Sequence, residues 1–215
     1  DMTHDTYRPA AMARFKARLS GDGMPTALDG RIAVPSIMRS LIGRTMPSMA
    51  GMPLGPDKGL TDGAFNQPYD IADFRMSGID APLGVPVGFW RSVGNSHNGF
   101  FMECFMDEAA SAGRMDPVAM RLKLMQPWPA AVKVVEKAAE MSGWGKSEPG
   151  KAKGFAFTLA FGGWVAQVIE IADTPQGIRL EKVWVAADVG TALDPDNLKA
   201  QIMSGIVYGL SAAMS

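Results

Sequence analysis

The stretch Ala13-Arg14-Phe15-Lys16-Ala17-Arg18-Leu19 alternates strictly between apolar and cationic residues. A period of two places the apolar side chains on one face of an extended strand and the cations on the other. The turn Gly21-Asp22-Gly23 follows, and residues 26–34 can return as the partner strand. A helix would instead place Arg14 and Arg18 one turn apart, where like charges repel. We therefore predict a β-hairpin.

Period-two patterns recur later in the chain. One strand is expected over residues 69–79. Residues 155–161 and 164–172 predict two strands on either side of Gly162-Gly163, and residues 178–187 predict a third. The second half of the protein should therefore also contain a sheet of consecutive antiparallel strands.

Helical patterns occupy the region between these strands. The first helix should follow a cap at Asn95 or Ser96 and end at Gly113. It carries Phe101, Cys104, Phe105 and Glu108 at helical spacing, and Cys104, which lies among aromatic residues, is expected to be an inert small core residue. Asp116-Pro117 begins a helix to about Met125, Pro129 one to about Met141, and Asp194-Pro195 a long final helix.

Residues 38–58 show neither the period of a strand nor that of a helix. Pro47, Gly51, Pro53 and Pro56 interrupt the segment between its methionines, so we expect an irregular loop. Two interpretations stay open: a surface loop whose methionines cover the core, or a lid over a site.

These patterns predict an α+β fold of antiparallel β-hairpins packed with helices. Three segments are expected: a β-rich first lobe with a methionine-rich loop over residues 1–94, a helical segment over 95–150, and a second lobe over 151–215. The second lobe combines the hairpin strands with the final helix.

The composition excludes several classes of function. The 215 residues carry a formal net charge of -1, which argues against a nucleic-acid-binding protein. No run approaches the ~20 apolar residues of a membrane-spanning helix. One cysteine, Cys104, and two histidines, His4 and His97, make a disulfide or a protein-ligated metal site unexpected. Because the chain starts at Asp1 without a start methionine, we expect a piece of a longer protein.

The sequence gives little indication of a conventional catalytic arrangement of side chains. Asp107 and Glu108 are adjacent on a helix and point about 100° apart, so a paired acid/base role is disfavoured. His97 near Ser92 lacks the nucleophile-elbow pattern, and a helix-cap or surface histidine is the favoured interpretation. From the residues alone, no self-contained active site is predicted.

Four stretches nevertheless carry a family resemblance. In chain order they are Asp5-Thr6-Tyr7-Arg8-Pro9-Ala10-Ala11, residues 85–108 around Gly88-Phe89-Trp90-Arg91-Ser92-Val93-Gly94, residues 153–168, and residues 187–201. They resemble the molybdenum-binding large subunit of the isoquinoline 1-oxidoreductase type, in the xanthine dehydrogenase and aldehyde oxidase family. The fold would then be part of the domain that binds the molybdenum cofactor in molybdenum hydroxylases.

The resemblance implies an enzyme that oxidatively hydroxylates aldehydes or N-heterocycles with water at a molybdopterin centre. The cofactor would be the cytosine dinucleotide form, and iron-sulfur clusters would lie on a small partner subunit. Such a cofactor needs no metal ligand from the protein, which agrees with the scarcity of histidine and cysteine. The parent enzyme could belong to the bacterial cytoplasm or periplasm.

The resemblance also assigns residues. Arg91 matches an arginine beside the metal, Trp90 and Val93 match flanking pocket positions, and Gln201 matches a glutamine near the pterin. Gly162 and Gly163 match a loop near the cofactor. For Arg91 the alternative is a structural salt bridge, and for Gln201 a solvent-facing side chain.

Other parts of the family pattern are missing. The cofactor-gripping loops would lie before Asp1, and the catalytic base, a glutamate, would lie after Ser215. We therefore expect an internal fragment that binds no cofactor and has no activity alone. Its partners would be the rest of the parent chain and the iron-sulfur subunit. Self-association is expected through either the final helix, which carries Gly205 and Gly209, or the methionine-rich loop. The alternative is a stand-alone binding or interaction module without catalysis.

Overall fold

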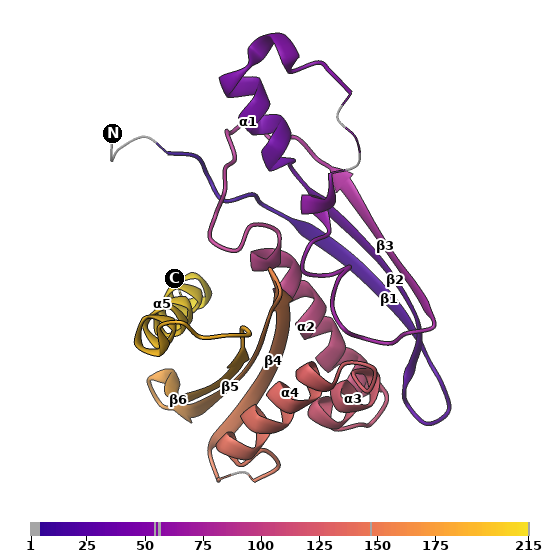
Figure 1. Ribbon diagram of the computed structural model, residues 1–215. Coiled ribbons are helices and arrows are strands. Elements are labelled where there is room, and N and C mark those ends of the chain that lie inside the picture. Colours follow the sequence, from indigo (N-terminus) through magenta and orange to yellow (C-terminus); the bar gives the residue numbers. More distant parts are fainter. Residues whose placement is uncertain (1–4, 54, 56, 147, 215) are drawn as a thin grey trace.

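Two three-stranded sheets and five helices make up the computed structural model, which describes residues 5–53, 55, 57–146 and 148–214. Helix α2 (Asn95–Ala112) runs between the two sheets (Figure 1). Buried apolar side chains of both sheets and of α2 to α4 form one continuous core. The predicted α+β class is confirmed.

The first sheet begins with the predicted hairpin. Strands β1 (Met12–Leu19) and β2 (Pro25–Val34) pair antiparallel, with Phe15 opposite Gly30. Phe15 packs edge-on against Phe105 of α2, with ring centroids 5.4 Å apart. The apolar face of the alternating stretch therefore covers the helix, as its period predicts.

Strand β3 (Asp73–Asp80) completes this sheet in a direction that the sequence did not predict. It pairs parallel with β2, so the sheet is not built from hairpins alone. Parallel neighbours require a crossover connection, which usually contains a helix. Residues 35–72 form that crossover.

The crossover contains regular structure, so the prediction of an irregular loop over residues 38–58 is wrong in its first half. It holds α1 (Ile37–Thr45) and the short 3-10 turns η1 (Pro47–Met49) and η2 (Lys58–Leu60). Ser36 caps α1 by accepting a hydrogen bond from the N–H of Arg39 at 3.1 Å. The four methionines of this segment do not cover the core, because each is at least 40% exposed. They are Met38, Met46, Met49 and Met52.

The helices α3 (Pro117–Leu124) and α4 (Pro129–Ser142) begin where predicted. Asp116 accepts a hydrogen bond from the N–H of Ala119 at 2.8 Å, which confirms its role as a cap. At the start of α2, neither Asn95 nor Ser96 acts as a side-chain cap, because both lie inside the helix. Gly113 ends α2 as predicted.

The core-facing side of α2 does not include Cys104. Met102, Met106, Ala109 and Ala110 are buried, whereas Cys104 and Glu108 are exposed. The prediction of a core cysteine is therefore wrong. Neighbouring stripes of this helix are both apolar, and helical spacing alone does not indicate which one meets the core.

The second sheet follows the predicted strands closely. Strands β4 (Lys151–Ala160), β5 (Gly163–Thr174) and β6 (Gly177–Asp188) pair antiparallel in sequence order. Phe161 and Gly162 form the turn between β4 and β5, with φ of 50° and 83°. Positive φ at both positions is the geometry of the tight turns that suit hairpins.

A buried ion pair joins the helices to the second sheet. Arg121 of α3 and Glu103 of α2 have side chains 0% and 5% exposed, and Arg121 Nε donates to Glu103 Oε2 at 3.0 Å. The hydroxyl of Tyr69 donates to Glu103 Oε1 at 2.5 Å, and the N–H of Phe157 in β4 donates to Oε2 at 2.7 Å. Asp107 accepts a further bond from Arg121 at 2.7 Å.

Burial and charge act in opposite directions on this pair. Burial raises the pKa of Glu103, while Arg121 and the two other donors lower it. Burial lowers the pKa of Arg121, but Tyr69, Glu103 and Asp107 together raise it above its ordinary value. The charges are tolerated because their hydrogen bonds are satisfied by four different segments.

A close backbone contact fixes the far end of the first hairpin. The turn residue Gly23, with φ of 84°, lies against Gly113 at the end of α2. A Cβ on either residue would collide with the carbonyl group of the other. Only glycine allows the turn and the helix end to approach so closely.

The last helix, α5 (Pro195–Met214), has no buried residue. One face is half-buried along Leu198, Ile202, Ile206 and Leu210. Around Gly205 and Gly209 there is open space within 4 Å of an added Cβ, so no described segment makes the close approach expected there. In the described part of the chain, no helix combines the length and apolar character needed to cross a membrane.

We expect Glu103→Gln to destabilise the protein by about 3 kcal/mol or more, because it leaves a buried guanidinium without its full countercharge. Urea unfolding followed by circular dichroism measures the change. The control is Glu108→Gln on the exposed side of the same helix, which should change stability by less than about 0.5 kcal/mol. Equal effects of the two variants would contradict the role of the ion pair.

Gly113→Ala should destabilise the chain by about 1 to 3 kcal/mol, since the new methyl group meets backbone atoms that side-chain motion cannot relieve. Thermal unfolding would show the loss as a lower Tm. Gly84→Ala is the matched control, because an added Cβ there meets nothing within 4 Å. A Gly113→Ala variant as stable as the control would show that the hairpin turn simply moves away.

Candidate functional site

Arg91 and Gln201 lie in direct contact although they are 110 positions apart. Arg91 Nη2 donates to the Oε1 and the main-chain oxygen of Gln201 at 3.3 and 3.2 Å. Arg91 Nη1 donates to Ser204 Oγ at 2.9 Å. Sequence reasoning missed Ser204, whose only signal is its position three residues after Gln201, on the same side of α5.

The Arg91 side chain projects from a strained loop. Ser92 and Val93 have φ of 71° and 50°, a region that β-branched residues such as valine rarely adopt. Such a conformation costs on the order of 1–3 kcal/mol and is typical of functional sites. The N–H of Val93 donates to the oxygen of Trp90 at 2.8 Å, which closes the turn.

The start of α2 anchors this loop to the crossover. Asn98 is fully buried, and its Nδ2 donates to the main-chain oxygens of Leu60 and Asp62 at 3.1 and 2.9 Å. Gly94 lies so close to the chain that an added Cβ would stand 2.5 Å from the oxygen of Gly59. These contacts explain how the strained conformation is maintained.

Trp90 joins three segments at the same place. Its ring lies 5.2 Å from that of Tyr208 in α5, and the Arg8 guanidinium lies 5.9 Å from the Trp90 ring centroid. Arg8 also donates to the oxygen of Ser96 at 3.4 Å. The N-terminal segment, the Arg91 loop and the last helix therefore meet around Trp90.

His97 is buried near this site, which corrects the expected cap or surface position. Its residue is 6% exposed, and neither ring nitrogen has a hydrogen-bond partner among the described residues. Burial lowers the pKa of His97 to about 4, with a smaller contribution from the charge of Arg8. The imidazole is therefore neutral at pH 7.

Gly162 and Gly163 lie at the β4–β5 turn. An added Cβ at Gly162 would meet nothing within 4 Å, and one at Gly163 would be 3.5 Å from the Val189 side chain. No hydrogen bond between described residues joins these glycines to Arg91 or Gln201. The structure thus joins Arg91 and Gln201 by hydrogen bonds, beside Trp90, whereas the glycine pair has no hydrogen bond to either among the described residues.

The remaining candidates form no catalytic arrangement. Ser92 Oγ donates to the main-chain oxygen of Arg91 at 2.5 Å rather than to a histidine. Asp107 pairs with Arg121, so it and Glu108 do not act as a carboxylate pair. Within the described ranges, no group of three or more His, Cys, Asp and Glu residues could hold a metal ion.

A separate cavity of about 210 Å³ lies between the end of α4 and the second sheet. Its Lys153 donates to the main-chain oxygen of Ser142 at 2.7 Å and lies 3.7 Å from Glu170. Trp144 Nε1 donates to Asp116 Oδ2 at 2.8 Å. Because these polar groups already have partners that close the helix end, the cavity has a structural explanation.

Comparison with known proteins finds related oxidoreductases. The chain is 30% identical to the beta subunit of isoquinoline 1-oxidoreductase of Brevundimonas diminuta, over all of this chain and 28% of the relative. It is 26% identical to a membrane-bound aldehyde dehydrogenase, named for pyrroloquinoline quinone, of Gluconacetobacter polyoxogenes, over all of this chain and 31% of the relative. A nicotinate dehydrogenase subunit of Pseudomonas putida is 25% identical over 95% of this chain and 19% of its own length.

Among solved structures, the chain is similar to the aldehyde oxidoreductase of Desulfovibrio gigas. That match has a TM-score of 0.43 and 19% identity, over 81% of this chain and 21% of the other. No family model matches the chain. The chain spans less than a third of the length of the curated relatives named above. It is a relative of the beta subunit of isoquinoline 1-oxidoreductase.

The buried histidine predicts a pH dependence of stability. As the pH falls below 6.5, the unfolded chain binds a proton at His97, whereas the folded chain does so only near pH 4. Stability from this residue is therefore present above pH 6.5 and should fall by up to about 3 kcal/mol as the pH is lowered towards 4.

Urea unfolding between pH 7 and pH 4 tests this dependence, with His97→Gln as the reference because it removes only this titration. The difference in stability between the two proteins should change across the window from pH 6.5 to pH 4. A constant difference would mean that His97 titrates alike in both states.

Proposed function

We propose that this chain, which is related to the beta subunit of isoquinoline 1-oxidoreductase over its whole length, is part of the large subunit of a molybdenum hydroxylase. The enzyme would oxidise an aldehyde or an aromatic N-heterocycle with oxygen from water. The names of the relatives support this substrate class, since they contain isoquinoline, nicotinate or aldehyde. The contact between Arg91 and Gln201 is the observation that supports the position of the site.

In this proposal Arg91, Gln201 and Ser204 form one wall of the cofactor and substrate site, beside Trp90 and Val93. The strained loop and the anchored start of α2 fix the direction of the Arg91 side chain. Rigid positioning of a cation is what electrostatic catalysis requires, because charge develops at one defined place in the transition state.

The donors at this wall fit an anionic cofactor. Arg91 Nε and the Gln201 amide NH2 have no hydrogen-bond partner among the described residues. A molybdopterin dinucleotide is rich in acceptor atoms, and arginine pairs well with phosphate and other anionic oxygens. The open space around the Gly162 turn would admit another group, which supports a contact there too.

The bound cofactor would supply the redox chemistry, by providing the oxygen that enters the substrate and accepting two electrons. Arg91 would bind and orient the reacting group and stabilise the negative charge that develops on it. Trp90 and Val93 would shape the pocket for a flat substrate. The catalytic base is proposed, on the family resemblance alone, to be a glutamate of the complete subunit that lies after Ser215.

The other partners belong to the same proposal. Iron-sulfur clusters on a small subunit would receive the electrons, and the cofactor would be the cytosine dinucleotide form. The 215-residue chain alone is expected to bind no cofactor and to be inactive. A stand-alone binding module is the competing function, and cofactor analysis of the complete subunit distinguishes the two.

Arg91→Ala in the complete, partner-bound subunit should lower kcat about 100-fold or more, because an electrostatic donor is lost from the transition state. Arg91→Lys should recover part of the rate, since it keeps the charge but loses the fork of donors. The assay is oxidation of an aldehyde and of an N-heterocycle, with molybdenum per subunit measured by elemental analysis.

The matched control is Lys133→Ala at an exposed position of α4, which should leave kcat and molybdenum content unchanged. Full activity of Arg91→Ala at normal molybdenum content would show that Arg91 has only a structural role. A complete subunit that contains pyrroloquinoline quinone in place of molybdenum, or no cofactor at all, would refute the proposed function.

A further inference from the structure

The outward face of the first sheet carries an unusual concentration of charge. Five cationic side chains project from it: Arg14, Lys16 and Arg18 on β1, Arg31 on β2 and Arg75 on β3. Two carboxylates, Asp29 and Asp73, share the face. This gives a net charge of +3 on one face of a chain whose overall charge is -1, so the remaining residues are net negative.

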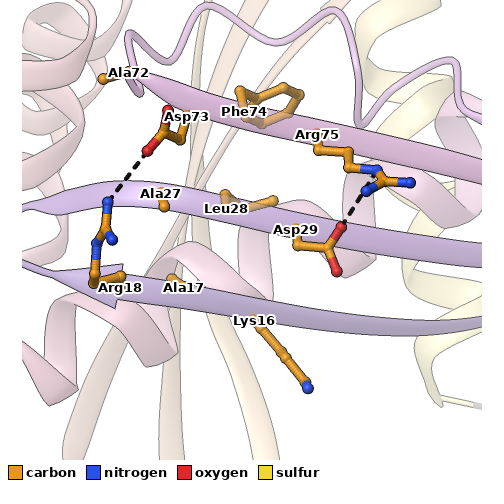
Figure 2. A pocket seen from close by; sticks show the side chains of 10 residues that line it. All are labelled: Lys16, Ala17, Arg18, Ala27, Leu28, Asp29, Ala72, Asp73, Phe74 and Arg75. Atoms are coloured by element: carbon orange, nitrogen blue, oxygen red, sulfur yellow. Dashed lines mark hydrogen bonds and ion pairs between the residues drawn. The ribbon is translucent and has the colours of Figure 1, made fainter.

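The strand register arranges these side chains in rows. Lys16, Asp29 and Arg75 lie opposite one another across the three strands, and Arg18, Ala27 and Asp73 form the next row. Figure 2 labels these side chains, with the short side chain of Ala27 between Arg18 and Asp73. The rows frame an open hollow of about 690 Å³.

The carboxylates neutralise the cations only in part. Arg18 pairs with Asp73 at 3.2 Å, but Asp29 is shared between Arg31 and Arg75 at 3.8 and 3.9 Å. The Arg18, Arg31 and Arg75 side chains are 69%, 63% and 77% exposed.

Arg14 and Lys16 form no ion pair with any described residue. Both are exposed residues of β1. The face therefore keeps unused cationic donors that point to solvent.

We propose that this face docks an acidic surface of another protein. The arginine and lysine side chains of these rows would bind carboxylates of the partner. Asp29 and Asp73 would pair with basic residues of the partner and so fix how the two surfaces align. Charged faces of this kind accelerate association and select the partner more than they raise affinity. Because the three charged rows span only about 14 Å along the strands, the contact is at the small end of protein interfaces and should be weak and salt-sensitive.

The surroundings favour a protein over other polyanions. Beyond the row that contains Arg14 and Arg31, the same face becomes apolar, with Met12 and Ile79 76% and 49% exposed. Arginine mixed with exposed apolar side chains is typical of protein interfaces. A nucleic acid would instead meet two carboxylates within the face, where its continuous phosphate charge is repelled.

Fluorescence anisotropy with a labelled decaglutamate peptide and the 215-residue chain tests this proposal. Binding should be detectable at low ionic strength and should weaken steeply as NaCl rises to about 0.15 M, where the screening length is about 8 Å. The double variant Arg14→Gln, Lys16→Gln should bind about threefold to tenfold more weakly. These two side chains make no ion pair in the structure, so the sheet should stay folded, which urea unfolding checks.

The control is Lys123→Gln with Lys133→Gln, which changes the net charge equally at exposed positions on α3 and α4. It should bind the peptide like the unchanged chain. The proposal is refuted by an absence of peptide binding, or by equal weakening in the control. It is also refuted if phosphatidylserine vesicles or a single-stranded DNA oligonucleotide bind more tightly than the peptide.

Discussion

The fold depends on the buried contact between Arg121 and Glu103. A charge of either sign is costly inside a protein, and this pair is stable only because Tyr69, Asp107 and the backbone of β4 complete its hydrogen bonds. Those partners belong to the crossover, to α2 and to the second sheet. The contact therefore requires all of these segments to be in place together, and it locks the two sheets onto opposite sides of α2.

A second link strengthens this arrangement. The side chain of Gln67 both donates to and accepts from the backbone of Leu159 in β4, at 3.1 and 2.9 Å. With Asn98 holding the start of α2 to the crossover, the strained loop before α2 is surrounded by fixed backbone. This rigidity explains why Val93 keeps an unfavourable conformation and why Arg91 has a defined direction.

The proposed functions occupy two separate surfaces. Arg91 and Gln201 lie where the loop before α2 meets α5, whereas the cationic rows lie on the outer face of the first sheet (Figures 1 and 2). A site for chemistry and a surface for association can therefore be altered independently.

Local patterns in the sequence determined the first hairpin, the Asp116 cap, the tight turn at Gly162 and the strands of the second sheet, because each depends on neighbouring residues. The resemblance also selected Arg91 and Gln201, but only the tertiary structure placed them in contact and added Ser204. The parallel pairing of β3, the helix α1 in the crossover, and the burial of His97 and Arg121 were likewise decided by the tertiary structure. Each of these depends on which faces of distant segments pack together, and the free energy of that packing is absent from any local pattern.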